Sequence, residues 1–254
     1  MATPLRLLAS AVLPYLIYSL STGVFRWEAL VVLAAIAGAA AFWYVWLPRN
    51  TVSDLLFLAL AVTVVVTKAF PRIYARARPS SRIEILGTLM WIRLGITELL
   101  SVRGAENPGF GLFPRAREWR SGVLHFLAFL PIGAALALAL GFTRPRAPSV
   151  AWWKIAGVFA GMLWVVALGE EFFFRGVIQR RLADWRGETT AIVFTSVLFG
   201  VAHLGYGPFP NWRFALVASV AGLCYGHAYS KTRSVRAFMV AQALVNTVWR
   251  TCFS

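Results

Sequence analysis

The sequence contains only two cysteines, Cys224 and Cys252, among its 254 residues. Neither belongs to a C-x-x-C pair, so the chain lacks the spacing of a disulfide framework or a zinc knuckle. Acidic residues are scarce as well, because ten Asp and Glu stand against 25 Lys and Arg, for a formal charge of +15. The arginines fall between apolar runs and not on a separate basic segment. This distribution argues against a nucleic-acid-binding domain and favours a membrane protein oriented by its loop charges.

Charged residues of either sign make up only 14% of the chain, whereas 59% of the residues are hydrophobic and the mean hydropathy is +0.68. A soluble domain of this length cannot bury so much apolar surface. Apolar runs of roughly 17 to 22 residues, the length that crosses a hydrocarbon core, recur along the chain. The predicted spans are Leu5–Leu20, Ala29–Leu47, Leu55–Phe70, Gly122–Phe142, Val150–Phe174, Thr189–Leu204, Trp212–Ser230 and Val235–Trp249.

These runs predict an all-α polytopic membrane helix bundle of about eight transmembrane helices, because helices satisfy their own backbone polar groups in lipid. We expect a single membrane domain over residues 1–254, in a multi-pass protein of a cell membrane, the bacterial inner membrane. Residues 71–121 mix charge, Pro and Gly with one amphipathic stretch, Ile83–Leu100. Because Arg93 and Glu98 interrupt that stretch, it predicts an interfacial helix within a loop and not a further span. The arginine density of this loop and of Arg180–Arg186 predicts that both face the cytoplasm.

The stretch ALGEEFFFRGVIQRR places two adjacent glutamates inside an apolar run. A carboxylate at the centre of a membrane helix costs about 3 kcal/mol on insertion scales. Glu171 and Arg175 are four residues apart with the acid first, so they share a helix face and can form an ion pair. Glu170 points about 100° away in an α-helix and lacks that local partner. A buried carboxylate without a partner suits a general base. Two glutamates at a wet helix end would instead be ordinary interfacial charges.

Two further pairs of residues lie on later spans. Phe199 and His203 are one turn apart on the sixth span, and Gln242 and Asn246 are one turn apart on the eighth. Polar groups inside apolar helices need partners across the bundle. A single histidine within a membrane is usually a hydrogen-bonded core residue. Polar groups on three helices instead indicate a shared site, which we expect in a core over residues 150–250.

The order and spacing of these residues resemble the motifs of a group of intramembrane proteases, the CAAX prenyl endopeptidase and bacteriocin-processing (abortive-infection, CPBP-type) family. The motifs are E-E-x-x-x-R, F-x-x-x-H and H-x-x-x-N, or a close relative of the last. The matching residues are Glu170, Glu171 and Arg175 for the first motif, Phe199 and His203 for the second, and Gln242 and Asn246 for the third. The resemblance covers about Val150 to Trp249.

The resemblance implies an endopeptidase that hydrolyses a peptide bond of a membrane-associated or exported protein. Peptide hydrolysis needs a base for the attacking water and hydrogen-bond donors aimed at the developing oxyanion. The residues matching Glu170 and His203 would activate the water, and those matching Asn246 and Arg175 would position the substrate or stabilise the oxyanion. The resemblance therefore implies catalytic roles for Glu170, His203, Asn246 and Arg175, and supporting roles for Glu171, Gln242 and Phe199.

Gln242 departs from the family pattern, which usually has histidine at this position. Glutamine can donate a hydrogen bond but cannot titrate. Glu170 and His203 supply two of the three ligands that catalytic zinc typically takes, and we expect His125 and His227 at interfacial positions. We therefore predict no metal ligand set and no firmly implied cofactor, with a weakly bound divalent metal such as zinc as the alternative.

The expected partners are a peptide or protein substrate in or at the membrane and the lipid bilayer, but no nucleic acid. Two other functions stay open from the sequence. The glutamine at position 242 is compatible with a catalytically silent family member that acts as a membrane scaffold or immunity factor. Acidic residues within a membrane also serve proton relays, which leaves a small ion-coupled transporter as a third hypothesis.

Overall fold

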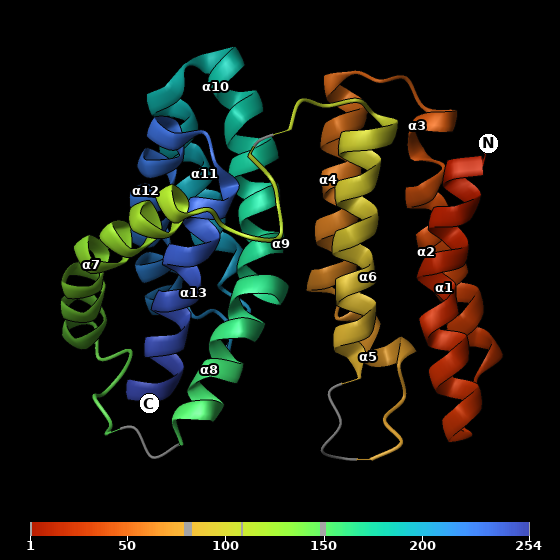
Figure 1. Cartoon of the computed structure of the whole chain (residues 1–254), viewed down its shortest axis with the longest axis horizontal. Coiled ribbons are helices and arrows are strands. Elements are labelled where there is room, and N and C mark those ends of the chain that lie inside the picture. The colour runs from red at the N-terminus through yellow and green to blue at the C-terminus, as the bar shows by residue number, and fades with distance from the viewer. Residues whose placement is uncertain (1, 79–82, 108, 148–150, 254) are drawn as a thin grey trace. The chain divides into compact units, whose positions relative to one another are not determined.

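The computed structural model describes residues 2–78, 83–107, 109–147 and 151–253. Helices form the regular structure of these residues, which contain no strand and only an isolated bridge between Pro145 and Phe253. The chain divides into two compact units, residues 1–106 and residues 107–254 (Figure 1). The prediction of an all-α membrane helix bundle is confirmed.

Unit 1, residues 1–106, is built from long helices that run side by side (Figure 1). Its elements are α1 (Ala2–Thr22), α2 (Trp27–Ala41), α3 (Trp43–Trp46), α4 (Thr51–Val66), α5 (Ala69–Ile73), α6 (Glu84–Thr97) and the π-helical η1 (Glu98–Val102). Helix α1 packs against α2 and α6. The buried residues of α2 include Ala29, Ala37 and Ala40, whose small side chains allow neighbouring helices to approach closely.

The stretch predicted as an interfacial helix is helical in the structure. Residues Glu84–Val102 form one helical run of 19 residues that is long and apolar enough to cross a membrane. The two charges that interrupt the apolar pattern are accommodated inside unit 1, because Arg93 donates a hydrogen bond to Ser10 of α1 and Glu98 has no exposed surface. Residues 75–78 and 103–106 therefore lie at opposite ends of this helix.

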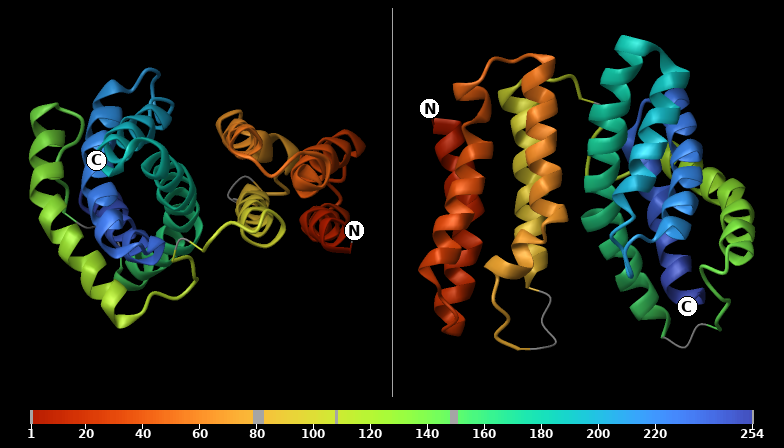
Figure 2. Two further views of the ribbon diagram at one scale, coloured as in Figure 1. Left: turned by 90° about the horizontal axis from the view of Figure 1, so that it is seen from above. Right: turned by 180° about the vertical axis from the view of Figure 1, so that it is seen from behind.

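Unit 2, residues 107–254, is arranged around one of its own helices, α13. Its elements are α7 (Ala116–Ala139), α8 (Trp152–Gly161), η2 (Met162–Ala167), α9 (Leu168–Glu171), η3 (Phe172–Gln179), α10 (Arg180–Arg186), α11 (Glu188–Ala202), α12 (Trp212–Thr232) and α13 (Val235–Cys252). The elements from α8 to α10 follow one another in a single helical run, Trp152–Arg186. Helix α13 packs against α7, α8, η2, α9 and α12 (Figure 2). This central position explains why α13 carries polar residues and still has most of its side chains buried.

Within the described residues, four helices are long and apolar enough to cross a membrane: Thr3–Thr22, Glu84–Val102, Ala116–Ala139 and Trp152–Arg186. Three shorter apolar helices, Trp27–Ala41, Thr51–Val65 and Glu188–Ala202, coincide with predicted spans. Large apolar side chains such as Val31, Leu56 and Leu127 are more than half exposed on these helices. Such side chains suit a lipid surround, in which the hydrocarbon tails replace water.

Glycines bring α11 and α12 close together in unit 2. A Cβ atom added to Gly222 of α12 would lie 2.9 Å from the Cα atom of Ser196 on α11. A Cβ atom added to Gly200 of α11 would collide with the carbonyl oxygen of Ala215 on α12. Because neither position has room for a side chain, the two helices form a tight pair. This pair fixes the place of Phe199, which precedes Gly200, and of His203 at the end of α11.

Candidate active site

The two glutamates lie on a single α-helical turn between two π-helical segments. Glu170 and Glu171 end α9, η2 precedes this element, and η3 follows it. A π-helical segment has a wider turn than an α-helix and is often found at functional sites. The helix geometry around the motif therefore differs from the regular α-helix that the sequence pattern predicts.

Glu170 receives a hydrogen bond from the central helix. The side-chain Nε2 of Gln242 on α13 donates to Oε2 of Glu170 at 2.5 Å. Gln242 is 3% exposed, whereas Glu170 is partly exposed. Glu170 has no ion-pair partner within four residues on its own helix, as expected, but it has a neutral donor from another helix. The amide orients the carboxylate without cancelling its charge.

Glu171 and Arg175 form the predicted pair inside the bundle. The Nε atom of Arg175 lies 3.4 Å from Oε2 of Glu171, and neither side chain has any exposed surface. The guanidinium carbon of Arg175 lies 4.5 Å from the ring centroid of Phe199, a cation–π contact. The carbonyl oxygen of Gly222 lies 3.5 Å from Nη2 of Arg175. The guanidinium of Arg175 is thus enclosed by protein groups, with the ring of Phe199 against it.

His203 lies at the end of α11 with one ring nitrogen fixed. Its Nδ1 atom is 2.7 Å from the carbonyl oxygen of Phe199. Because a carbonyl oxygen only accepts hydrogen bonds, Nδ1 carries a proton, and the Nε2 atom of the neutral ring keeps its lone pair. The ring of His203 also contacts the rings of Phe199 at 4.6 Å and Phe214 at 4.9 Å between centroids. Phe199 therefore links His203 to Arg175, which the sequence spacing alone did not indicate.

Asn246 lies one turn after Gln242 on the same face of α13 and is partly buried. Among the residues that the structure describes, its side-chain amide makes no hydrogen bond. The structure thus joins Glu170 to Gln242 and Phe199 to His203 by direct contacts, and it places Asn246 next to the first pair along α13.

Tyr206 is a site residue that the sequence reasoning missed. Its ring stacks on His203, with centroids 5.3 Å apart and planes 20° apart, and its side chain is half-exposed. Asn211 holds this loop, because its Nδ2 atom donates to the carbonyl oxygen of Tyr206 at 2.7 Å. The negative charge of Glu170, together with burial, raises the pKa of Tyr206 to about 12. The phenol therefore keeps its proton near neutral pH and remains a hydrogen-bond donor. Nothing in the motif spacing marks Tyr206, since the loop conformation alone brings it to His203.

The donor set does not fit a catalytic zinc ion. No group of three His, Cys, Asp or Glu side chains that could hold a metal ion occurs within the described residues. His227 is exposed, and His125 is bonded to the carbonyl oxygen of Ser121 at 2.8 Å. Catalytic zinc usually takes three protein ligands, so we derive no catalytic step through a metal.

These features define an all-α membrane protein with a carboxylate, an imidazole and amides inside its helix bundle. Residues 151–248, less than half of the chain, match the family model described as type II CAAX prenyl endopeptidase Rce1-like. The resemblance drawn from the motifs is therefore confirmed over these residues, which are similar to Rce1-like CAAX proteases. All seven motif residues fall within the matched segment. Neither a curated protein nor a solved structure matches the chain.

Proposed function

We propose that this protein is an intramembrane endopeptidase in which Glu170 and His203 activate a water molecule against a peptide carbonyl. The observation that carries the proposal is the hydrogen bond from the amide of Gln242 to the carboxylate of Glu170. A neutral donor fixes this carboxylate within a family-typical motif, so the carboxylate keeps the capacity to accept a proton. The adjacent Glu171 faces a guanidinium and is used to hold Arg175.

The reaction then follows from the residues in their places. Glu170 accepts one proton of the water while the water oxygen forms a bond to the carbonyl carbon. The lone pair on Nε2 of His203 accepts a hydrogen bond from the same water and orients it. The carbon–nitrogen bond breaks, and the proton held by Glu170 passes to the leaving amine nitrogen.

The oxyanion that forms on the carbonyl oxygen needs donors in place before the reaction. The free amide of Asn246 on α13 and the protonated phenol of Tyr206 are the two candidates for this role. The half-exposed ring of Tyr206 leaves its hydroxyl accessible to a substrate. Arg175 contributes indirectly, because its contact with Phe199 positions the ring that neighbours His203.

The substrate class in this proposal is a membrane-associated or exported protein, presented at the bilayer in which the helices lie. The proposed location is a bacterial inner membrane, with the helices crossing it several times. The competing function is a catalytically silent scaffold or immunity factor, which Gln242 favours because it replaces the usual histidine of the motif. An ion-coupled transporter is the less favoured candidate.

Comparative proteomics of two strains separates these functions. One strain carries the natural protein and the other carries Glu170→Gln at the same expression level. If the protein is an endopeptidase, at least one membrane or exported protein should stay uncleaved only in the Glu170→Gln strain. If the protein is a scaffold that needs no proton transfer, the cleavage patterns of the two strains should be identical. If it is an ion-coupled carrier, Glu170→Gln should instead change ion transport in proteoliposomes.

A further inference from the structure

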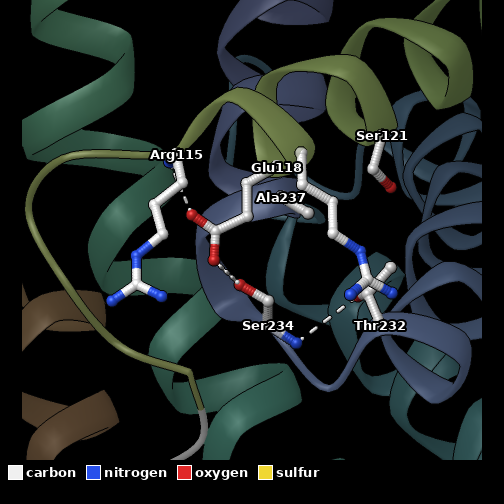
Figure 3. A pocket seen from close by; sticks show the side chains of 7 residues that line it. Arg115, Glu118, Ser121, Thr232, Ser234 and Ala237 are labelled. Atoms are coloured by element: carbon white, nitrogen blue, oxygen red, sulfur yellow. Dashed lines mark hydrogen bonds between the residues drawn. The ribbon is translucent and has the colours of Figure 1, made fainter.

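A cavity of about 170 Å³ lies where the start of α7 meets the turn between α12 and α13. The lining includes two arginines, one glutamate and three hydroxyl side chains: Arg115, Arg117, Glu118, Ser121, Thr232 and Ser234. Figure 3 shows Arg115 extending beside the carboxylate of Glu118, with Ser234 and Thr232 on the facing segment. None of these residues belongs to the candidate active site.

The only carboxylate of the lining is fully engaged by the protein. Oε1 of Glu118 accepts hydrogen bonds from Oγ of Ser234 at 2.7 Å and from Nε of Arg236 at 2.8 Å. Oε2 accepts from the backbone N–H of Arg115 at 2.7 Å. Arg236 therefore balances the charge of Glu118. Within the described part of the chain, the guanidinium groups of Arg115 and Arg117 form no ion pair, so the cavity keeps two uncompensated positive charges.

The cavity also lies at the first residues of a helix that is long and apolar enough to cross a membrane. Arg115 immediately precedes α7, one of the four helices long and apolar enough to cross a membrane. Two apolar side chains precede it, Leu112 at 52% and Phe113 at 73% exposed, and Trp119 follows it at 37%. The Nε1 atom of Trp164 donates to the carbonyl oxygen of Leu112 at 2.8 Å and fixes this segment to η2. Exposed aromatic side chains at the end of a span are typical of the level of the lipid headgroups.

We propose that this cavity binds the phosphate headgroup of an anionic phospholipid. Two arginines match the charge and the hydrogen-bond acceptors of a phosphodiester. The hydroxyl of Ser121 can add a further donor, since those of Ser234 and Thr232 already donate to Glu118 and to the carbonyl oxygen of Ala228. Basic pockets between membrane helices bind anionic headgroups in this way. The exposed side chains of Phe113 and Trp119 are close in sequence to the cavity arginines and would accommodate the acyl chains, which a free phosphate ion would not use.

Binding of fluorescently labelled phosphatidylglycerol to the purified full-length protein in detergent tests this proposal. Because each surface arginine contributes about 1 kcal/mol toward an anionic headgroup, Arg115→Gln/Arg117→Gln should weaken binding about thirtyfold. The matched control, Arg120→Gln/Arg144→Gln, removes the same charge from exposed positions outside the cavity and should change the affinity less than about twofold. The charge-preserving Arg115→Lys/Arg117→Lys should lose less affinity than the glutamine pair, because it keeps both charges but not the donor geometry of the guanidinium groups.

Three results would overturn the proposal. An equal loss in the control pair would show attraction to the overall charge of the protein, and an unchanged affinity in the cavity pair would show that the arginines are not used. Inorganic phosphate that binds as tightly as phosphatidylglycerol would show that the site takes the anion alone. If the double variant loses helical circular dichroism, the single variant Arg117→Gln tests the proposal instead, because this side chain is exposed and its replacement should not disturb folding. Arg117→Gln should weaken binding of phosphatidylglycerol about fivefold.

Discussion

The amide of Gln242 and the carboxylate of Glu170 are joined by a hydrogen bond between the central helix α13 and the glutamate-bearing helix α9. The neighbouring Glu171 faces the buried guanidinium of Arg175 instead. Two adjacent carboxylates thus have different partners, one neutral and one cationic. In the proposed mechanism, Glu170 is the proton acceptor and Glu171 forms a structural ion pair. This difference in partners is the physical basis of the predictions that follow.

The bond between Gln242 and Glu170 predicts how position 242 responds to substitution. Gln242→Leu removes the donor and leaves a carboxylate oxygen unpaired, which should cost about 1–3 kcal/mol. Gln242→His restores a donor and should change the rate or its pH dependence only modestly. The measurement is kcat on a client protein found by proteomics, with thermal unfolding as the readout of stability. A leucine variant as active as the natural protein would show that the bond has no role in the reaction.

Neutralising Glu170 and neutralising Glu171 should have different effects on activity and stability. We expect Glu170→Gln to abolish turnover and to leave the protein folded, because the amide cannot accept the proton. Glu171→Gln should lower stability by about 3–5 kcal/mol, since Arg175 then lies buried without its counter-charge, and lower activity only in part. The control is Glu188→Gln, which breaks the more exposed pair with Arg233 and should cost about 0–1 kcal/mol. Loss of turnover in Glu171→Gln but not in Glu170→Gln would reverse the two roles.

Removal of the Tyr206 hydroxyl should lower kcat and leave KM unchanged. Tyr206→Phe keeps the ring that stacks on His203 and removes only the donor, so kcat should fall about a hundredfold if the phenol stabilises the oxyanion. The control is Tyr18→Phe in unit 1, where the hydroxyl donates to the carbonyl oxygen of Ala75. That variant should leave kcat unchanged. A fall in the stability of Tyr206→Phe with unchanged kcat would assign Tyr206 to folding alone.

The pKa of Tyr206 should report the charge of Glu170. In the natural protein the carboxylate, together with burial, raises this pKa to about 12. Glu170→Gln removes the negative charge that disfavours the tyrosinate, so the pKa should move down toward the ordinary value of 10.0. The difference in tyrosinate absorbance between each protein and its Tyr206→Phe variant isolates this residue. An unchanged titration would place the two side chains too far apart to share a site.

Removal of divalent metals should leave activity intact. The described residues offer no group of three metal ligands. In the proposed mechanism, Glu170 and His203 therefore activate the water without a metal ion. Cleavage of the client should therefore persist after titration with a strong chelator. Activity that appears only in Gln242→His with added zinc would show that the family mechanism needs a metal and that this chain does not perform it.

Hydropathy predicted most of the helices, because a lipid-facing side chain must be apolar wherever it lies along a span. At Ile83–Leu100 it predicted an interfacial helix, because Arg93 and Glu98 interrupt the apolar pattern. The structure shows both charges directed into unit 1, with Arg93 bonded to Ser10 and Glu98 fully buried. A hydropathy pattern records which residues are charged but not which of them face a neighbouring helix.

Helix periodicity predicted those features of the candidate site that depend on residues of a single helix. The pair of Glu171 and Arg175 followed from their spacing, and the polar groups of Gln242 and Asn246 indicated a partner across the bundle. The bond to Glu170 itself needed the packing of α13 against α9. The burial of Arg175, the π-helical segments and the stacking of Tyr206 on His203 depend on tertiary contacts and on a loop conformation, which no local pattern encodes.

The central claim is that Glu170 accepts a proton from the water that cleaves a peptide bond. The most direct test is cleavage of the client by purified protein in proteoliposomes prepared in ¹⁸O-labelled water, with mass spectrometry of the product. The account predicts one labelled oxygen at the new carboxyl terminus with the natural protein and no cleavage with Glu170→Gln of equal helicity. Equal cleavage by Glu170→Gln, or none by the natural protein, would contradict it.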